Sequence, residues 1–297
     1  MQKIIVTGAS GFIGQYVVNC LLEMGNLVVG ISGHKKMPSK KNYISITADI
    51  RKQEEVAKIF EQNQSCEGII HLAADIDMIG SEKTIETNCL GTYYLAKHAT
   101  QYGMKFFINM SSIPVIGNPV HLPIDEEHPL SPKTLYHITK LTGEQMVEQI
   151  CSKSMYTLNL RISSPIGRNM SRKNYLSVLL DKCLKGEEIE IYGQGLRVQN
   201  YIDVRDIVQA ILCGIKAQKS GRYLIAGNQS ISNRELAILC KKLTKSGSEL
   251  IFGRREDPEE GNRWEISNEK ARTILNFTPQ YDILDSVKWI VDGMKEE

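Results

Sequence analysis

The sequence lacks an excess of charge of either sign. Its 36 Lys and Arg residues nearly balance 34 Asp and Glu residues, which leaves a formal net charge of +2. Proteins that bind nucleic acid usually carry a strong basic excess or a basic patch, so composition gives no reason to expect nucleic acid as a partner. Charged residues make up 24% and hydrophobic residues 42% of the chain, proportions typical of a globular protein.

Long hydrophobic runs and cysteine motifs are also missing. No apolar stretch approaches the roughly 20 residues that a membrane-spanning helix needs, so we expect no membrane partner. The chain opens on Met-Gln-Lys followed at once by a strand pattern, unlike a secretory signal. The seven cysteines are scattered, odd in number and without a Cys-x-x-Cys pair. This usage predicts reduced thiols in a cytoplasmic protein and no metal site.

A glycine-rich turn near the start carries the clearest functional signal. Ile4 to Val6 predict a buried parallel strand, and apolar residues at helical spacing from Phe12 onward predict a helix after it. In such a unit Gly8 would allow the tight turn, Gly11 the approach of a pyrophosphate, and Gly14 close packing of the helix on the sheet. The free N–H groups at the helix start would hold the phosphates. We therefore predict dinucleotide binding; the alternative is an ordinary glycine-rich turn.

The end of the second predicted strand bears on the choice of cofactor. Leu27 to Ile31 is followed by Ser32-Gly33-His34-Lys35-Lys36. In a dinucleotide fold an acidic residue here binds the 2′-hydroxyl of NAD, whereas a cation nearby accommodates the 2′-phosphate of NADP. No carboxylate is present, so we expect NAD or NADP, with NADP favoured. The alternative is a solvated loop whose lysines contact nothing.

Three further predicted strands bring small and polar residues to one edge of the sheet. They span residues 43–46, 68–71 and 105–110, and they lead to Asp49-Ile50, Leu72-Ala73-Ala74 and Ser111-Ser112. Ligands in doubly wound sheets bind at the carboxyl ends of the strands. Small residues after the fourth strand would let the nicotinamide half of the cofactor lie close to the backbone.

Some residues near these strand ends have two interpretations. Asp49 could accept a hydrogen bond from the adenine amino group, with Ile50 beside the ring, or it could cap the helix predicted over 54–60. His71 is interpreted as a packed histidine at a strand end rather than a catalyst. Asn88 lies within a long amphipathic helix predicted over 82–102, where it either faces water or fixes a backbone group beside the site.

A tyrosine and a lysine share one face of the next helix. An irregular segment with five prolines, Ile113 to Lys133, is expected to wall the site. The helix that follows, to about Cys151, carries Tyr136 and Lys140 at the i, i+4 spacing that places two side chains on one face. A neighbouring ammonium favours a phenolate, so Tyr136 could exchange a proton with a sugar or alcohol oxygen.

Beyond residue 165 the alternation of parallel strands and helices loosens. Beyond it, predicted strands cover residues 188–192, 198–202 and 222–225, and predicted helices cover 175–185, 204–217, 234–243, 268–275 and 284–294. Before it, a further strand is predicted over residues 155–161. The strand at 155–161 alternates apolar and polar residues, which suggests a place near the sheet edge. Ser232 and Glu235 form a capping-box pattern before the 234–243 helix. We predict an α/β fold: a Rossmann-type doubly wound parallel sheet over 1–165, to which some later segments return, and a smaller α/β substrate lobe over 166–297.

Together these motifs resemble the extended short-chain dehydrogenases/reductases of the nucleotide-sugar (NAD-dependent) epimerase/dehydratase family. The resemblance covers nearly the whole chain. The matching segments are 7–14, 49–50, 71–74, 111–112 with 115–117, Tyr136 with Lys140, 160–161 with Pro165, 191–195, 201–207 and 267–277.

The resemblance implies roles for individual residues. Tyr136 would be the general acid/base, Lys140 would bind the nicotinamide ribose and lower the tyrosine pKa, and Ser112 would orient the reacting oxygen. The implied cofactor contacts are Gly8, Ser10, Gly11, Phe12, Ile13, Gly14, Ser32, His34, Lys35, Asp49, Ile50, Leu72, Ala73, Ala74, Tyr136, Lys140 and Pro165. The implied substrate contacts are Ser112, Ser164, Arg197, Gln199 and Arg254, with the arginines suited to a diphosphate.

The resemblance implies an epimerase that transfers a hydride at a ring carbon, taken as C4, of a nucleotide-diphosphate sugar. An NADPH-dependent nucleotide-4-keto-sugar reductase is the alternative, and a non-catalytic NADP-binding regulatory protein is a third. Sugar dehydratases of the family carry Asp-Glu after the residue equivalent to Ser112, where this chain has Ile113-Pro114, so dehydration is not expected. A homodimer through helices like 82–102 and 133–151 is also implied.

Overall fold

The structure, a computed structural model, describes residues 1–33, 38, 40–151 and 155–296. Its centre is a seven-stranded sheet in the order β10-β6-β5-β4-β1-β2-β3, with all six strand pairs parallel. The strands are β1 (Lys3–Thr7), β2 (Leu27–Ser32), β3 (Tyr43–Thr47), β4 (Gly68–His71), β5 (Phe106–Ser112), β6 (Tyr156–Ile162) and β10 (Gly221–Ile225). This confirms the predicted doubly wound α/β fold, with β6 second from the edge as its alternation suggested.

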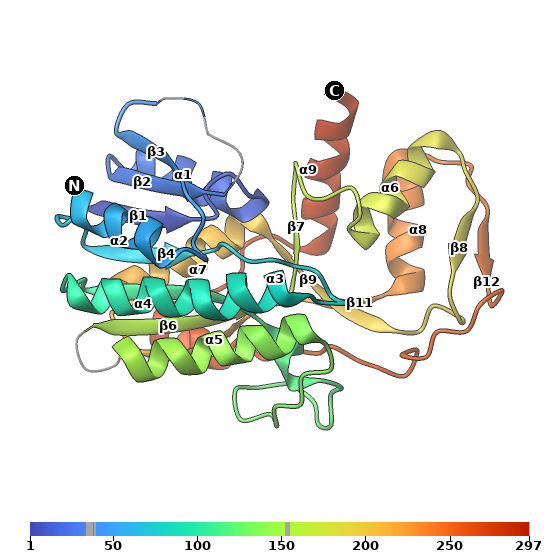
Figure 1. Cartoon of the computed structure of the whole chain (residues 1–297). Coiled ribbons are helices and arrows are strands. Elements are labelled where there is room, and N and C mark those ends of the chain that lie inside the picture. The colour runs from blue at the N-terminus through green and yellow to red at the C-terminus, as the bar shows by residue number, and fades with distance from the viewer. Residues whose placement is uncertain (34–37, 39, 152–154, 297) are drawn as a thin grey trace.

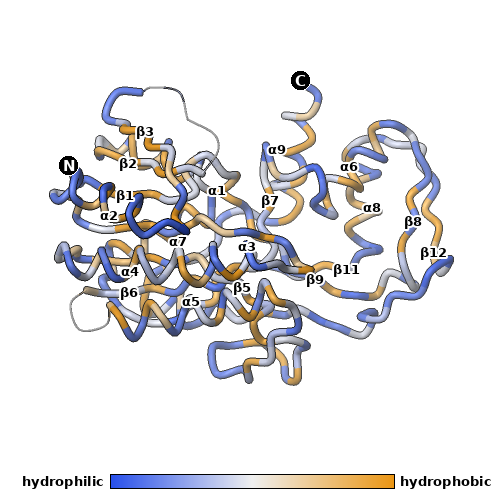
Figure 2. The backbone as a smooth tube through the Cα atoms, viewed as in Figure 1, coloured by the Kyte–Doolittle hydropathy of each residue, from blue (hydrophilic) through white to orange (hydrophobic). Residues whose placement is uncertain are grey.

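Helices cover both faces of this sheet (Figure 1). On one face lie α1 (Phe12–Glu23) and α7 (Val204–Ala217), and on the other α2 (Gln53–Gln62), α4 (Thr92–Gln101) and α5 (Leu135–Cys151). Ile4 and Val6 pack in the layer between the sheet and helices α1 and α7, and Ile5 packs in the layer on the opposite face, which α2, α4 and α5 cover. Because both faces are buried, the strand reads as a continuous apolar run instead of an alternating one. In Figure 2, α4 and α5 alternate between apolar and polar colours along their length, as amphipathic helices do.

A smaller group of elements lies beyond the carboxyl ends of the central strands, on the right of Figure 1. It contains a three-stranded sheet, β11-β9-β7, and a two-stranded sheet, β12-β8. Its strands are β7 (Ser164–Ile166), β8 (Ile189–Ile191), β9 (Val198–Asp203), β11 (Ser230–Ser232) and β12 (Leu250–Phe252), and its helices are α6 (Tyr175–Lys185), α8 (Asn233–Thr244) and α9 (Ile283–Glu296). The domain boundary at residue 165 remains a prediction, while β10 from the later half joins the central sheet beside β6.

In the later half, one local prediction is confirmed and one is corrected. Ser232 caps α8 by accepting from the Glu235 amide at 3.2 Å, and the Glu235 carboxylate accepts from the Ser232 amide at 2.9 Å. The helix predicted over 268–275 differs, because its last five residues form the π-helical turn η3 (Ala271–Leu275), which ends at Asn276 with a left-handed φ of 57°. No helix of the described chain is both long and apolar enough to cross a membrane.

The helix predicted over 82–102 is interrupted in its middle. A short helix α3 (Glu82–Ile85) passes into the π-helical segment η1 (Glu86–Gly91), and α4 continues from there. Such π-bulges are frequent at functional sites. Here the bulge is accompanied by a bond from the Thr92 hydroxyl to the Asn88 carbonyl oxygen at 2.7 Å.

A buried histidine connects this bulge to the central sheet. Because the Thr92 hydroxyl already donates to a carbonyl, it must accept from Nε2 of His71, at 2.9 Å. Nδ1 is then left to accept from the Thr7 hydroxyl at 2.7 Å. His71 is therefore neutral, and burial together with the charge of Lys140 lowers its pKa to about 3. The interpretation of His71 as a packed strand-end histidine is confirmed.

This buried imidazole predicts acid sensitivity of the fold. Since the pKa of His71 is about 3 in the folded chain, against 6.5 for an unperturbed histidine, the unfolded chain binds more protons below pH 6.5. Stability contributed by neutral His71 is therefore present above about pH 6.5 and is lost as the pH falls towards 3. Between pH 7 and pH 5 the loss amounts to about 2 kcal/mol of unfolding free energy.

Urea unfolding of the His71→Gln variant at both pH values measures this contribution. The variant should lose about 2 kcal/mol less than the wild type on going from pH 7 to pH 5. His121→Gln, at an exposed histidine, is the control and should keep the wild-type difference. An unchanged pH dependence in His71→Gln would contradict the assignment.

Candidate active site

The first glycine turn has the geometry of a phosphate cradle. Gly8 has a φ of +66°, and a Cβ added to it would lie 2.8 Å from the Ala73 nitrogen. A Cβ on Gly14 would lie 2.0 Å from the Gly8 carbonyl oxygen. Gly11 is the N-cap of α1 and provides no side chain to cap the helix, so the amides of the first turn, at Phe12 and beyond, remain able to bind an anion. These features fit the predicted pyrophosphate of a dinucleotide.

The second predicted cofactor contact adjoins this turn. Ser32 ends β2, is buried, and its hydroxyl accepts from the Ser10 amide at 3.2 Å. The hydroxyl thus holds the glycine turn from a position where NAD-binding proteins of this fold carry an acidic residue. His34 and Lys35, the predicted cationic contacts, lie outside the described residues.

Asp49 is engaged by a neighbouring arginine. Its carboxylate accepts from the Arg51 guanidinium at 2.7 to 3.0 Å and from the Arg51 amide at 3.0 Å, and these bonds lower its pKa. The alternative role as a helix cap is wrong, because α2 begins at Gln53 with Lys52 at its N-cap and no side-chain cap. Ile50 is buried and packs against Gly91 of the π-helical segment.

The end of β4 lies directly against the glycine turn. The Thr7 hydroxyl accepts from the amides of Leu72 and Ala73, both at 3.2 Å, and Ala73 is the residue that a Gly8 side chain would strike. The segment that continues through Ala74 therefore follows the cradle closely. This is the place predicted for the nicotinamide half of the cofactor.

Lys140 is buried on α5, with 7% of its surface exposed. Burial lowers its pKa to about 8, against the opposing influence of Glu144 and Cys89. Within the described part of the chain, its ammonium makes no hydrogen bond and no ion pair. Its charge in turn acts on His71, which places the amine near the end of β4. A buried, unpartnered ammonium at this position can bind a ligand hydroxyl.

Tyr136 occupies the same face of α5, but its ionisation differs from the expectation. Burial raises the pKa of the phenol to about 12. The predicted lowering by Lys140 is absent in the chain itself, since Lys140 is not among the groups acting on the phenol. Desolvation by burial is the cause of the raised pKa, and the attraction that the spacing along the helix suggested does not act on the phenol. Tyr136 is therefore a neutral proton donor near pH 7.

Asn88 fixes the backbone beside this helix, the second of its two interpretations. Its side-chain oxygen Oδ1 accepts from the backbone amide of Asp75 at 2.8 Å, and its side-chain nitrogen Nδ2 donates to the backbone carbonyl of Asp75 at 2.9 Å. The same nitrogen donates to the Thr139 hydroxyl at 3.0 Å. Asn88 thus connects the π-helical segment, the loop after β4 and the residue before Lys140.

Ser112 stands at the end of β5 and is partly exposed, whereas Ser111 faces the interior. The Ser111 hydroxyl donates to Glu144, and Glu144 also binds Arg161 of β6. The sequence interpretation missed Glu144. The signal available for it was the same i, i+4 spacing that relates Tyr136 to Lys140.

Apart from Ser112 on β5, the predicted substrate residues lie on or next to the strands of the smaller group of elements. Ser164 on β7 is the register partner of Tyr201 on β9, and Pro165 pairs with Ile202. Gln199 donates to the Asn233 side chain at 3.0 Å.

Both predicted diphosphate arginines are paired with carboxylates. Arg197 contacts Glu259 and lies 3.9 Å from Asp257, and Arg254 contacts Glu188. A diphosphate at either arginine would compete with these carboxylates.

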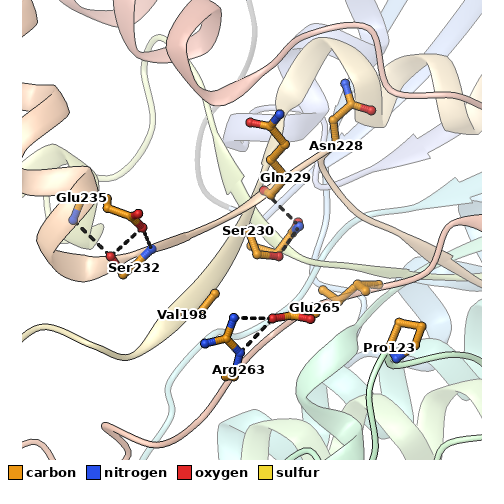
Figure 3. Close-up of a pocket in the computed structure, with 11 residues that line it drawn as sticks. Pro123, Val198, Asn228, Gln229, Ser230, Ser232, Glu235, Arg263 and Glu265 are labelled. Atoms are coloured by element: carbon orange, nitrogen blue, oxygen red, sulfur yellow. Dashed lines mark hydrogen bonds and ion pairs between the residues drawn. The ribbon is translucent and has the colours of Figure 1, made fainter.

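A separate pocket of about 480 Å³ opens between β9, β11 and residues 263–266 (Figure 3). Val198 and Asn200 line it from β9, and they lie on the face of that strand opposite to Gln199. Arg263 and Glu265, which form an ion pair at 2.6 Å, also line it. None of the predicted site residues lines it. Within the described chain, no group of three or more His, Cys, Asp or Glu side chains is placed to hold a metal ion.

Comparison with known proteins agrees with this geometry. The sequence model of the NAD dependent epimerase/dehydratase family matches residues 4–226. A putative UDP-glucose 4-epimerase of Methanocaldococcus jannaschii is 28% identical, over 98% of both chains. A dTDP-glucose 4,6-dehydratase of Streptomyces griseus is 25% identical, over 96% of this chain and 91% of that protein.

Solved structures show the same fold. That of the Thermotoga maritima UDP-glucose 4-epimerase with UDP-glucose superposes with a TM-score of 0.92 at 24% identity, covering 99% of each chain. From the family match over most of its length, the chain belongs to the NAD-dependent epimerase/dehydratase family, a family of enzymes.

Proposed function

We propose that this protein is a nucleotide-sugar epimerase that transfers a hydride at C4 of a nucleotide-diphosphate sugar. The observation that carries the proposal is the placement of Tyr136 and the buried, unpartnered Lys140 on α5, beside the strand ends that form the glycine cradle. Full-length relatives named UDP-glucose 4-epimerase, such as that of Halalkalibacterium halodurans at 27% identity over 96% of this chain, support it.

Three side chains of the site have separate roles in the proposed reaction. Tyr136 gives a proton to, and takes one from, the oxygen on the reacting carbon, and Ser112 donates a hydrogen bond to the same oxygen. Lys140, with a pKa of about 8, is mostly an ammonium ion near pH 7 and holds the cofactor ribose. A bound nicotinamide dinucleotide supplies the hydride acceptor and donor. The amides of the glycine turn hold its pyrophosphate.

The residues after Ser112 favour epimerisation over dehydration. Ile113 and Pro114 follow it in the 3₁₀ turn η2 (Ile113–Ile116), with Ile113 buried. Neither side chain can act as an acid or a base, and elimination of water needs both. We therefore place the protein with the epimerases of its family.

We also propose a substrate site on the smaller lobe and a cytoplasmic location. Ser164 and Gln199 would contact the nucleotide-diphosphate sugar, and Arg197 and Arg254 would exchange their carboxylate partners for its diphosphate. All seven cysteines are free, which agrees with the reducing cytoplasm.

Tyr136→Phe should lower kcat about a thousandfold, because the phenylalanine can neither donate nor accept the proton. Interconversion of UDP-glucose and UDP-galactose, followed by NMR, is the measurement. Tyr102→Phe, in which the altered hydroxyl lies at the far end of α4, is the matched control and should keep wild-type turnover. Undiminished turnover in Tyr136→Phe would rule out the assigned acid/base.

A reductase of nucleotide-4-keto sugars is the second candidate, and one observation favours it. The carboxylate typical of NAD-binding strands is replaced at the end of β2 by Ser32, whose hydroxyl is used by the Ser10 amide. A site without that negative charge does not repel the 2′-phosphate of NADPH, which is the usual cofactor of reductive enzymes. Net consumption of NADPH with a 4-keto sugar would identify the reductase, and interconversion of sugars without net cofactor change would identify the epimerase.

Ser32→Asp tests the cofactor preference that we propose, NADP over NAD. The aspartate keeps an acceptor for the Ser10 amide but repels a 2′-phosphate, so Kd for NADPH should rise at least about tenfold. Titration of cofactor fluorescence measures it, and Kd for NADH should change far less. Equal effects on both cofactors would contradict the preference.

We further propose a homodimer through α4 and α5, which run side by side in Figure 1. Tyr93 of α4 and Ile138 of α5 are 38% and 46% exposed, and Leu90 of the adjoining π-helical segment η1 is 42% exposed. Burying such residues against a second copy would stabilise the dimer by about 25 cal/mol per Å².

Light scattering should give a wild-type mass twice the 33.4 kDa of one chain. The double variant Tyr93→Glu/Ile138→Glu should be monomeric, because it would bury four carboxylates at the symmetric interface. Ile238→Glu, at an equally exposed isoleucine of α8 (52%), should remain dimeric. A monomeric wild type would refute the interface.

A further inference from the structure

Glu144 is a fully buried carboxylate one helical turn beyond Lys140, with no exposed surface. The Arg161 guanidinium, itself 1% exposed, donates to it through Nε at 2.9 Å and Nη2 at 2.7 Å. The Ser111 hydroxyl donates to the same carboxylate, and Arg222 approaches it at 3.7 Å. Burying two charges costs several kcal/mol, and their attraction offsets this only with favourable geometry. A pair of apolar residues would have filled this space without that cost.

The ion pair lies where α5 packs onto the central sheet. Ser111 on β5 and Arg161 on β6 are register partners, so Glu144 binds two adjacent strands at one level. The next residue of β5 is Ser112. Because Lys140 and Glu144 are separated by four residues on one helix, they share the face that meets these strands. Glu144 therefore fixes α5, and with it Lys140, relative to Ser112.

Within the described chain, Glu144 is the carboxylate that affects the pKa of Lys140. Burial is the largest influence on the pKa of Lys140 and lowers it, whereas Glu144 on α5 and Cys89 on the π-helical segment raise it. The third titratable group, His71 on β4, is neutral. Glu148, one turn beyond Glu144, is bound by Arg222 at 2.6 Å and by Asn159 at 2.9 Å, and it is not among these groups.

We propose that Glu144 is a positioning residue of the active site: held by Arg161 and Ser111, it supplies the buried negative charge that keeps the Lys140 amine an ammonium ion. The role given to Lys140 in turnover rests on the proposed function, whereas the electrostatic coupling of the two side chains does not. Loss of the Glu144 charge lets Lys140 lose its proton at a lower pH. The alkaline limb of the activity profile then moves to lower pH with it.

The coupling is measured directly by competitive acetylation of the protein without substrate, from about pH 6 to about pH 10, with mass spectrometry of the peptide that contains Lys140. In Glu144→Gln the pH at which Lys140 becomes reactive should fall by about one unit or more. The control Glu148→Gln removes a carboxylate from the same helix face one turn further on. It should leave the titration of Lys140 unchanged.

Glu144→Gln leaves the Arg161 guanidinium buried without a carboxylate partner, which can prevent folding. A second variant is therefore tested as well. Glu144→Gln/Arg161→Met removes both charges with similar volumes. Because it also removes the repulsion between Arg161 and Lys140, the pH at which Lys140 becomes reactive should fall by less than in Glu144→Gln, but still below the wild-type value. Titration of Lys140 as in the wild type, in whichever variant folds, would overturn the proposal. So would an equal shift in Glu148→Gln.

The activity profile separates this proposal from the proposed function. If Lys140 shifts in the variants but the wild type turns over no nucleotide sugar, the function is wrong and the coupling stands. If the wild type is an active epimerase but Lys140 does not shift, the coupling is wrong and the function stands. If both hold, the alkaline limb of kcat should move by the same interval as the Lys140 titration.

Discussion

The hydrogen bonds of one buried imidazole hold the two halves of the site together. His71 accepts from Thr7, whose hydroxyl also binds the amides that lie against the glycine cradle. It donates to Thr92, which holds the π-helical segment carrying Asn88. Asn88 in turn binds Thr139, the neighbour of Lys140. A continuous set of bonds thus runs from the dinucleotide turn to the helix proposed for catalysis, and it requires the imidazole to stay neutral.

Helix α5 carries the ionisable side chains of Tyr136, Lys140 and Glu144. Successive turns place a phenol with a pKa of about 12, an amine with a pKa of about 8 and a paired carboxylate on one face of the helix. Burial sets the first two values, and it sets them in opposite senses, because it disfavours the charged form of each group. The chain alone therefore holds Tyr136 protonated near neutral pH. The carboxylate opposes the loss of charge at Lys140.

Much of this could be predicted from the sequence, because it depends on local patterns. The apolar run from Ile4 to Val6, the turn at Gly8 and the capping box at Ser232 each specify their structure within a few residues. The bounds of α6 and α7 match the prediction for the same reason, since their apolar periodicity is strong. The family match follows from the same motifs.

What the sequence did not reveal depends on partners far along the chain. The π-helical segment around Asn88 is stabilised by bonds to residues 75 and 139, which hydrophobic periodicity does not encode. The Glu144–Arg161 pair joins a helix to a strand, and the raised pKa of Tyr136 follows from packing. The carboxylate partners of Arg197 and Arg254 are equally distant in sequence.

In the proposed epimerisation, the hydride that leaves C4 of the sugar returns to the same carbon. Incubation with UDP-glucose deuterated at C4 tests this most directly, with the product analysed by NMR. We expect UDP-galactose that retains deuterium at C4, with no net change in cofactor. Product that has exchanged its C4 deuterium for solvent hydrogen, or no UDP-galactose from the active protein, would contradict it.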